Sequence, residues 1–322
     1  MRLFAAFLYL GLCAAPPLHA ELTGVIRIAG NPELASRVTY WTNGFQRQHP
    51  AVRVKAHLTG SDTGMAALYT GKADLALLGR SPTPIEIQAF EWVYRYQPTQ
   101  IEVLTGSLDH PGRSPALVVF VHRDNPLRSL TLTQLEAIFG TEHRRSPENL
   151  RRWGQLGLTG DWAEHPINLY APDAMSGTGR FFRYAVLGDS RMMNWEVLKE
   201  FTDSSQRPHN AGTQIVAALA ADRYGLAVAN LGYSDDRVRP LALAVDAGSA
   251  PVSATRDTLV TREYPLTRVV TALCNCAPGA PLDPLVREFL RFILSPGGQQ
   301  DHADGYLPLA AADAARQRAK LE

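Results

Sequence analysis

The stretch Gly24–Gly79, "GVIRIAGNPELASRVTYWTNGFQRQHPAVRVKAHLTGSDTGMAALYTGKADLALLG", decides the fold of this chain. Apolar residues at steps of three and four after Gly30 indicate an amphipathic helix that Pro50 ends, and a shorter helix is expected over "TGMAALYTG". Three short apolar or alternating runs around these helices are typical of β-strands: Gly24–Gly30, Val52–Leu58 and Ala73–Leu78. The β-α-β-α-β order predicts a parallel sheet with helices on its faces.

A second set of elements begins at Ala116. The same patterns predict strands over 116–122, 167–171, 224–230 and 267–275. They predict helices over 131–140, 176–188, 211–222 and 282–295, with Thr131 as the N-cap of the first. Strands and helices alternate along nearly the whole chain, which predicts an α/β fold without internal repeats.

The first twenty residues, "MRLFAAFLYLGLCAAPPLHA", have the layout of a secretory signal peptide. One arginine precedes an apolar run that ends before a small residue, and cleavage is expected before Glu21. A membrane anchor is the alternative, but the run is shorter than the roughly 20 residues that a spanning helix needs. The sequence therefore predicts export.

The charges of the expected mature chain balance. The full chain has 32 basic and 31 acidic residues, and loss of Arg2 with the leader leaves 31 of each. Electrostatic binding of nucleic acid needs a basic face, so this class of partner is not expected.

Three small, polar loops precede predicted helices: 30–32, 60–64 and 175–180. In an open α/β sheet, such loops meet beyond the carboxyl ends of the strands. Their backbone N–H groups and the helix N-termini stabilise negative charge without a counter-charge. This arrangement favours an oxyanion as ligand.

The side chains of these loops fit the same chemistry. Ser176 and Thr178 carry hydroxyls that can donate to an oxyanion, and Gly177 between them permits a close approach of the backbone. The second loop offers Ser61, Asp62 and Thr63, and Arg80 follows the third strand as the nearest cation. The alternatives are an ordinary helix N-cap for "SGTG" and a surface position for Arg80.

The same stretch fits the motif of a catalytic site less well. A hydrolase nucleophile elbow needs glycine two residues before the serine, where Ala174 stands, although an esterase that uses Ser176 remains an alternative. A P-loop needs a Gly-Lys-Ser/Thr end, and the chain has none. We therefore expect no enzyme activity, no cofactor and no metal site.

Taken together, the ordered motifs resemble the periplasmic phosphate-binding proteins of bacterial ABC transporters. The resemblance runs from about Ile26 to Leu309 and is carried by "HPAVRVKAHLTGSDTGMAALYTGKADLALLGRSPT", "VFVHRDNPLRSLTLTQLEAIFG", "MSGTGRFF", "RYGLAVANLGY" and "YPLTR". It implies two α/β lobes of the type II-like periplasmic-binding-protein fold, joined by two crossing strands, with the ligand in the cleft between them. The implied lobes are residues 21–112 with 263–322, and residues 113–262.

The resemblance assigns ligand binding to particular positions. "GSDTG" looks like the family's phosphate loop and "MSGTG" like its Ser-Gly-Thr loop. Gly79-Arg80 stands where many members have Ser-Arg, and Gly30-Asn31-Pro32 stands at the first loop. The implied ligand-binding set is Asn31, Ser61, Asp62, Thr63, Arg80, Ser176, Gly177, Thr178 and Arg180.

Two positions depart from the family pattern. Pro172 stands where many members have an arginine, whose loss removes a contact of about 1.5–3 kcal/mol; Arg80 or Arg180 would have to compensate. The usual aspartate that accepts the phosphate proton is also missing, and Asp62 is the substitute. An acceptor there would favour a protonated oxyanion over sulfate.

The expected function is capture of phosphate or a related oxyanion in the periplasm, by a monomer, for delivery to an ABC permease. The alternative is a periplasmic sensor or interaction protein of the same fold that works without a transporter and has a degenerate anion pocket.

Overall fold

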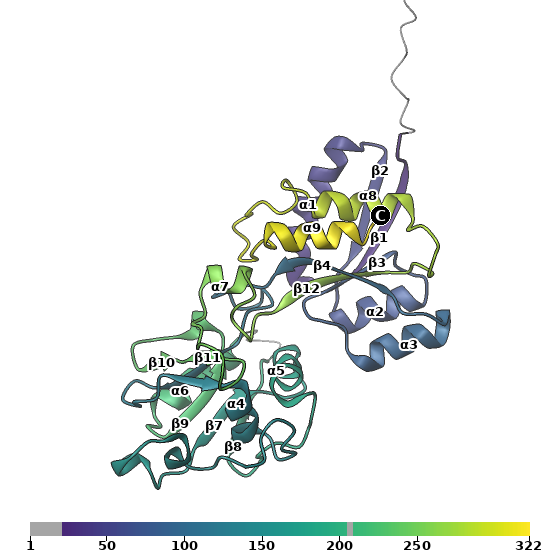
Figure 1. The fold of residues 1–322 in the computed structure, drawn as a ribbon. Helices are drawn as coiled ribbons and strands as arrows, with labels where there is room; N and C mark the ends of the chain where they lie inside the picture. Colours follow the sequence, from purple (N-terminus) through teal and green to yellow (C-terminus); the bar gives the residue numbers. More distant parts are fainter. Residues whose placement is uncertain (1–20, 205–208) are drawn as a thin grey trace, which may run out of the picture.

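The computed structural model describes residues 21–204 and 209–322. The predicted signal peptide, residues 1–20, lies outside the described residues. The elements form two bodies, a first lobe and a second lobe, which lie one above the other in Figure 1. The predicted two-lobed α/β fold is therefore confirmed.

The first lobe is built on a five-stranded sheet in the order β2-β1-β3-β12-β4. Its strands are β1 (Gly24–Gly30), β2 (Val52–His57), β3 (Leu75–Leu78), β4 (Thr99–Thr105) and β12 (Val269–Cys274). Its helices are α1 (Ala35–Gln48), α2 (Ser61–Tyr69), α3 (Pro84–Tyr94), α8 (Pro284–Ile293) and α9 (Ala311–Ala319), with the 3-10 turn η1 (Pro32–Leu34). As predicted, β1 is parallel to β2 and β3. The direction of β12 was not predicted, and it is antiparallel to β3 and β4.

Strand alternation divides the core of this lobe between two faces. Leu75 and Leu77 pack with α1 and α8, whereas Ala76 and Leu78 pack with Met65 of α2 and with α3. Because both faces are covered by helices, β3 is entirely apolar and buried. The sheet thus places the ends of β1 and β3, and the loops after them, toward the second lobe.

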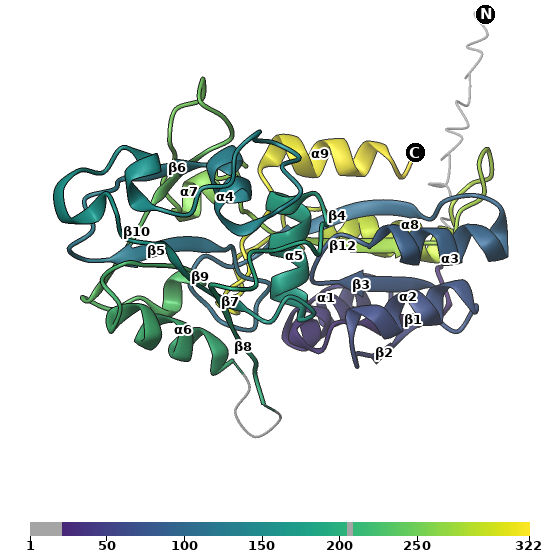
Figure 2. The same ribbon diagram turned by 90° about the horizontal axis from the view of Figure 1, so that it is seen from below.

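The second lobe has a five-stranded sheet in the order β10-β5-β9-β7-β8. Its strands are β5 (Val118–His122), β7 (Asn168–Pro172), β8 (Leu198–Phe201), β9 (Gly225–Ala229) and β10 (Val238–Pro240), beside a small pair β6 (Ser129–Thr131) and β11 (Ala242–Ala244). Its helices are α4 (Leu132–Phe139), α5 (Gly177–Leu187), α6 (Ala211–Ala220) and α7 (Arg256–Val260). Three 3-10 turns complete it: η2 (Trp153–Leu156), η3 (Gly160–Trp162) and η4 (Leu231–Tyr233). Figure 2 shows α6 on one face of the sheet and α4 on the other, with α5 toward the first lobe.

Two chain segments cross between the lobes. One leaves β4 and enters β5, and the other returns from α7 to β12. They run beside each other, since Gly106 N–H donates to Arg268 O at 2.9 Å and Leu117 N–H donates to Leu266 O at 3.2 Å. The residue limits given above for the lobes stay a prediction.

Three elements of the first lobe, α3, β4 and α9, were not predicted from the sequence. The start of α3 carries a readable capping box, in which Thr83 and Glu86 bond each other's backbone N–H. Only Phe90 of this helix is buried, while Ile85 and Trp92 are exposed. Because apolar residues lie on both its buried and its exposed sides, the sequence shows no clear helical spacing of apolar residues. The helix matters for the site because it positions Glu86.

Within the described ranges, no helix is long and apolar enough to cross a membrane.

Candidate functional site

A cavity of about 680 Å³ lies between the lobes, and we call it the interlobe cavity. Its wall contains the three loops predicted to meet there, together with Pro172 and Arg268. The structure brings all the predicted ligand-binding residues into this wall: Asn31, Ser61, Asp62, Thr63, Arg80, Ser176, Gly177, Thr178 and Arg180.

The first wall is the N-terminus of α2. "GSDTG" was expected to be a loop, but Ser61, Asp62 and Thr63 form the first helical turn, with Gly60 as N-cap. The Ser61 hydroxyl accepts from Gly79 N–H at 3.3 Å, and the Thr63 hydroxyl donates to Gly60 O at 2.8 Å. The N–H groups of all three first-turn residues have no acceptor within the described part of the chain. Unpaired N–H groups at a helix N-terminus can donate to an anion.

The facing wall is the N-terminus of α5. Ser176 is the N-cap: its hydroxyl accepts from Gly179 N–H at 3.0 Å and donates to Asp173 O at 2.7 Å. The N–H groups of Gly177 and Thr178 have no acceptor among the described residues. Ser176 is thus a helix cap whose helix offers free donors to the cavity, and no described histidine is hydrogen-bonded to it as a general base.

The two glycines of "SGTG" have different roles. A Cβ on Gly177 would meet nothing within 4 Å, so the packing seen here does not require glycine at that position. A Cβ on Gly179 would lie 2.1 Å from Asp173 O and 2.8 Å from Ala174 Cα. Packing therefore requires glycine at Gly179, where α5 lies against the turn before it, while the close approach of the Gly177 backbone to an oxyanion stays a prediction.

Arg80 is a buried, ion-paired cation rather than a surface residue. Its Nη1 and Nη2 donate to Oε2 and Oε1 of Glu86, each at 2.8 Å, and Nη2 also donates to Asp62. Its exposed fraction is 6%. Burial acts to lower the pKa of Arg80, but the hydrogen bonds and charges of Glu86 and Asp62 outweigh it and raise the pKa.

Asp62 connects the lobes. One carboxylate oxygen contacts Arg80 of the first lobe, and the other lies 3.4 Å from Nη1 of Arg180 on α5. Its side chain is nevertheless 66% exposed, since it stands in the cavity between the two guanidinium groups. An anion that enters here meets both arginines and this carboxylate.

Arg268 is the functional candidate that sequence reasoning missed. It precedes β12 and is 6% exposed; its Nη2 donates to Gly79 O at 2.9 Å, while its Nε is buried without an acceptor. It makes no ion pair within the described chain, and its guanidinium lies 5.3 Å from the centre of the Phe181 ring. Burial lowers the pKa of Arg268 to about 10, as does the nearby charge of Arg80. The only signal was its place in "YPLTR".

Pro172 ends β7 and lies in the cavity wall, so no guanidinium reaches the cavity from this position. Of the residues that the structure describes, three arginines line the interlobe cavity instead: Arg80, Arg180 and Arg268.

Comparisons with a protein family model and with known sequences both find relatives of this chain along most of its length. The model of the PBP superfamily domain matches residues 17–296. The phosphate-binding protein PstS of Pseudomonas aeruginosa is 34% identical over 304 residues, covering 92% of this chain and 88% of that protein. Protein SphX of Synechocystis is 28% identical and covers 94% of this chain and 83% of that protein.

Solved structures share the fold. PstS from Borrelia burgdorferi matches with a TM-score of 0.62 and 15% identity, covering 89% of this chain and 99% of that one. An ABC-type phosphate transport receptor from Vibrio cholerae matches with a TM-score of 0.58 and 21% identity, covering 88% and 99%.

Proposed function

The chain belongs to the PBP superfamily and to its PstS-like phosphate-binding family, and from this we propose that it captures phosphate between its lobes for uptake by an ABC transporter. It is a binding protein and not an enzyme. We further propose that it is exported to the periplasm with loss of residues 1–20, and that it acts as a monomer with lobes formed by 21–112 with 263–322 and by 113–262.

The observation that carries the proposal is the pair of helix N-termini that face one cavity. Unpaired N–H groups of Asp62 and Thr63 on α2, and of Gly177 and Thr178 on α5, surround the space that Arg80 borders. Such donors suit a compact, multiply charged oxyanion. The alternative of a degenerate pocket is not favoured, because Arg80, Arg180 and Arg268 line the cavity despite Pro172.

Calorimetric titration of the purified protein with inorganic phosphate tests this proposal. We expect one phosphate per chain with micromolar or tighter affinity, as uptake from dilute solution requires. Absence of heat with phosphate and with sulfate would instead favour the transporter-independent sensor.

Asp62 is the proposed selectivity residue. A carboxylate beside the ligand accepts the proton of hydrogen phosphate and repels sulfate, which has no proton to give. We expect Asp62→Asn to narrow the preference for phosphate over sulfate by roughly tenfold or more, mainly through tighter sulfate binding. Competition calorimetry measures this ratio.

Asp124→Asn is the matched control, since its side chain is similarly exposed, at 55%, but lies outside the interlobe cavity. An unchanged phosphate-to-sulfate ratio in Asp62→Asn would remove Asp62 as the proton acceptor.

A further inference from the structure

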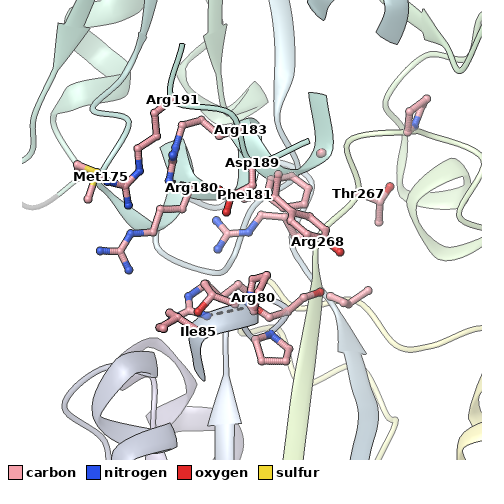
Figure 3. A pocket seen from close by; sticks show the side chains of 18 residues that line it. Arg80, Ile85, Met175, Arg180, Phe181, Arg183, Asp189, Arg191, Thr267 and Arg268 are labelled. Carbon is pink, nitrogen blue, oxygen red and sulfur yellow. Dashed lines mark hydrogen bonds and ion pairs between the residues drawn. The ribbon is translucent and has the colours of Figure 1, made fainter. Parts of the chain in front are cut away.

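A second cavity, of about 540 Å³, adjoins the interlobe cavity and shares Arg80, Met175, Arg180 and Arg268 with it. We call it the arginine cavity. Figure 3 shows Arg80 and Ile85 on one side of it, with Arg180, Arg183 and Arg191 across the gap and Arg268 between the two sides. The two cavities therefore lie side by side between the lobes, with these four residues in the wall of both.

Within residues 21–204 and 209–322, the summed formal charges of the side chains that line the two cavities differ in sign. Among the described residues, three arginines line the interlobe cavity against four carboxylates: Glu33, Asp62, Asp173 and Asp203. Five arginines line the arginine cavity against a single carboxylate, Asp189. An extended anion with one end held by the N–H groups of α2 and α5 therefore gains most when its other end enters the arginine cavity.

Three of these arginines keep unused donor capacity. Arg191 is exposed and makes no ion pair within residues 21–204 and 209–322. Arg183 is 4% exposed; its nearest carboxylate, on Asp189, lies 3.5 Å away, and its Nη1 is buried without an acceptor. Nε of Arg268 is buried and unpaired in the same wall. Unsatisfied buried guanidinium nitrogens are costly, so a cluster of them calls for an explanation.

Apolar side chains flank this charge. Phe181 lies beneath the Arg268 guanidinium, while Ile85 from the first lobe and Tyr184 from α5 are 61% and 57% exposed. Apolar walls beside cations lower the local dielectric constant and strengthen their attraction for an anion. A single phosphate ion is also far smaller than the two cavities together.

We propose that the ligand site extends into the arginine cavity and that the protein binds compounds with two linked phosphoryl groups, of which inorganic diphosphate is the simplest. One phosphoryl group occupies the interlobe cavity, so this inference rests on the proposed function. The second is held by Arg180, Arg183 and Arg191.

Calorimetric titration of the intact protein with inorganic phosphate and, separately, with diphosphate tests the inference. Two exposed positions allow variants that spare the fold: Arg191→Ala removes a cation, and Ile85→Glu adds a negative charge at the opposite wall. We expect each to weaken diphosphate binding by about fivefold and to change phosphate binding less than twofold. Arg123→Ala is the matched control, because Arg123 is 61% exposed and lines neither cavity.

The outcomes separate the two proposals. Binding of phosphate without diphosphate, or diphosphate binding that neither variant weakens, would overturn the extended site and leave the proposed function standing. Binding of diphosphate alone, weakened by both variants, would support the extended site and overturn inorganic phosphate as the ligand. Failure of both anions to bind would overturn both proposals.

Discussion

Replacing Arg268 with methionine is expected to weaken phosphate binding by roughly ten- to a hundredfold, without loss of stability. A hydrogen bond from a guanidinium to an anion contributes about 1.5–3 kcal/mol, which corresponds to this range of affinity. The charge of Arg268, however, is buried without a carboxylate partner in the described chain, and burial lowers the pKa of Arg268 to about 10. Methionine has a similar length and no charge, so relief of the buried charge should offset the lost hydrogen bond to Gly79 O and leave the free energy of unfolding about the same.

Arg37→Met is the matched control for this prediction. Arg37 is buried to a similar degree, with 1% exposed, but its Nε and Nη2 donate to both carboxylate oxygens of Asp304, at 2.8 and 2.6 Å. Removing it leaves a buried carboxylate unpaired, which should cost about 3–5 kcal/mol. Urea denaturation and phosphate calorimetry on both variants should therefore give opposite patterns. Undiminished phosphate affinity in Arg268→Met would exclude Arg268 from the site.

Replacing Gly179 with alanine is expected to lower the free energy of unfolding by about 3 kcal/mol. The new methyl group would lie 2.1 Å from Asp173 O, so the turn that precedes α5 must move. The same turn supplies the acceptor for the Ser176 hydroxyl. Displacement of the turn should also shift the N-terminus of α5, whose N–H groups face the cavity, and so weaken phosphate binding by about tenfold.

Gly177→Ala, two residues away, provides the comparison. Its methyl group meets no neighbour within 4 Å, and alanine favours a helix over glycine by about 0.5–1 kcal/mol. We expect stability to be unchanged or slightly higher. Urea denaturation curves of the two variants test the assignment, and equal destabilisation would contradict it.

Much of the fold was predictable because its signals are local. The alternation in β2, the helical spacing in α1 and the position of Thr131 before α4 each depend on residues within a few positions of one another. The missed helix α3 shows the limit of such signals, since a helix that buries only Phe90 leaves little apolar periodicity to detect.

The residues of the candidate site were predictable where they lie together in one short motif of the sequence. "GSDTG" and "MSGTG" are small and polar, and they stand directly before helices. The sequence also indicated that Arg80 lies near them, because the loops after neighbouring parallel strands meet at one edge of the sheet. Sequence alone therefore determined an α/β fold with anion-binding loops at one edge.

Tertiary structure decided the rest, because these features depend on contacts between distant residues. Arg268 meets Gly79 across 189 positions of the chain, and Asp62 meets Arg180 across 118. The two glycines of "SGTG" look alike in sequence, but only the turn packed behind α5 makes Gly179 indispensable. The local charge of a cavity also depends on the tertiary structure. The chain has nearly equal numbers of acidic and basic residues, yet the fold places five arginines around one cavity. Residue patterns specify local conformation, whereas the folded chain determines which charges become neighbours.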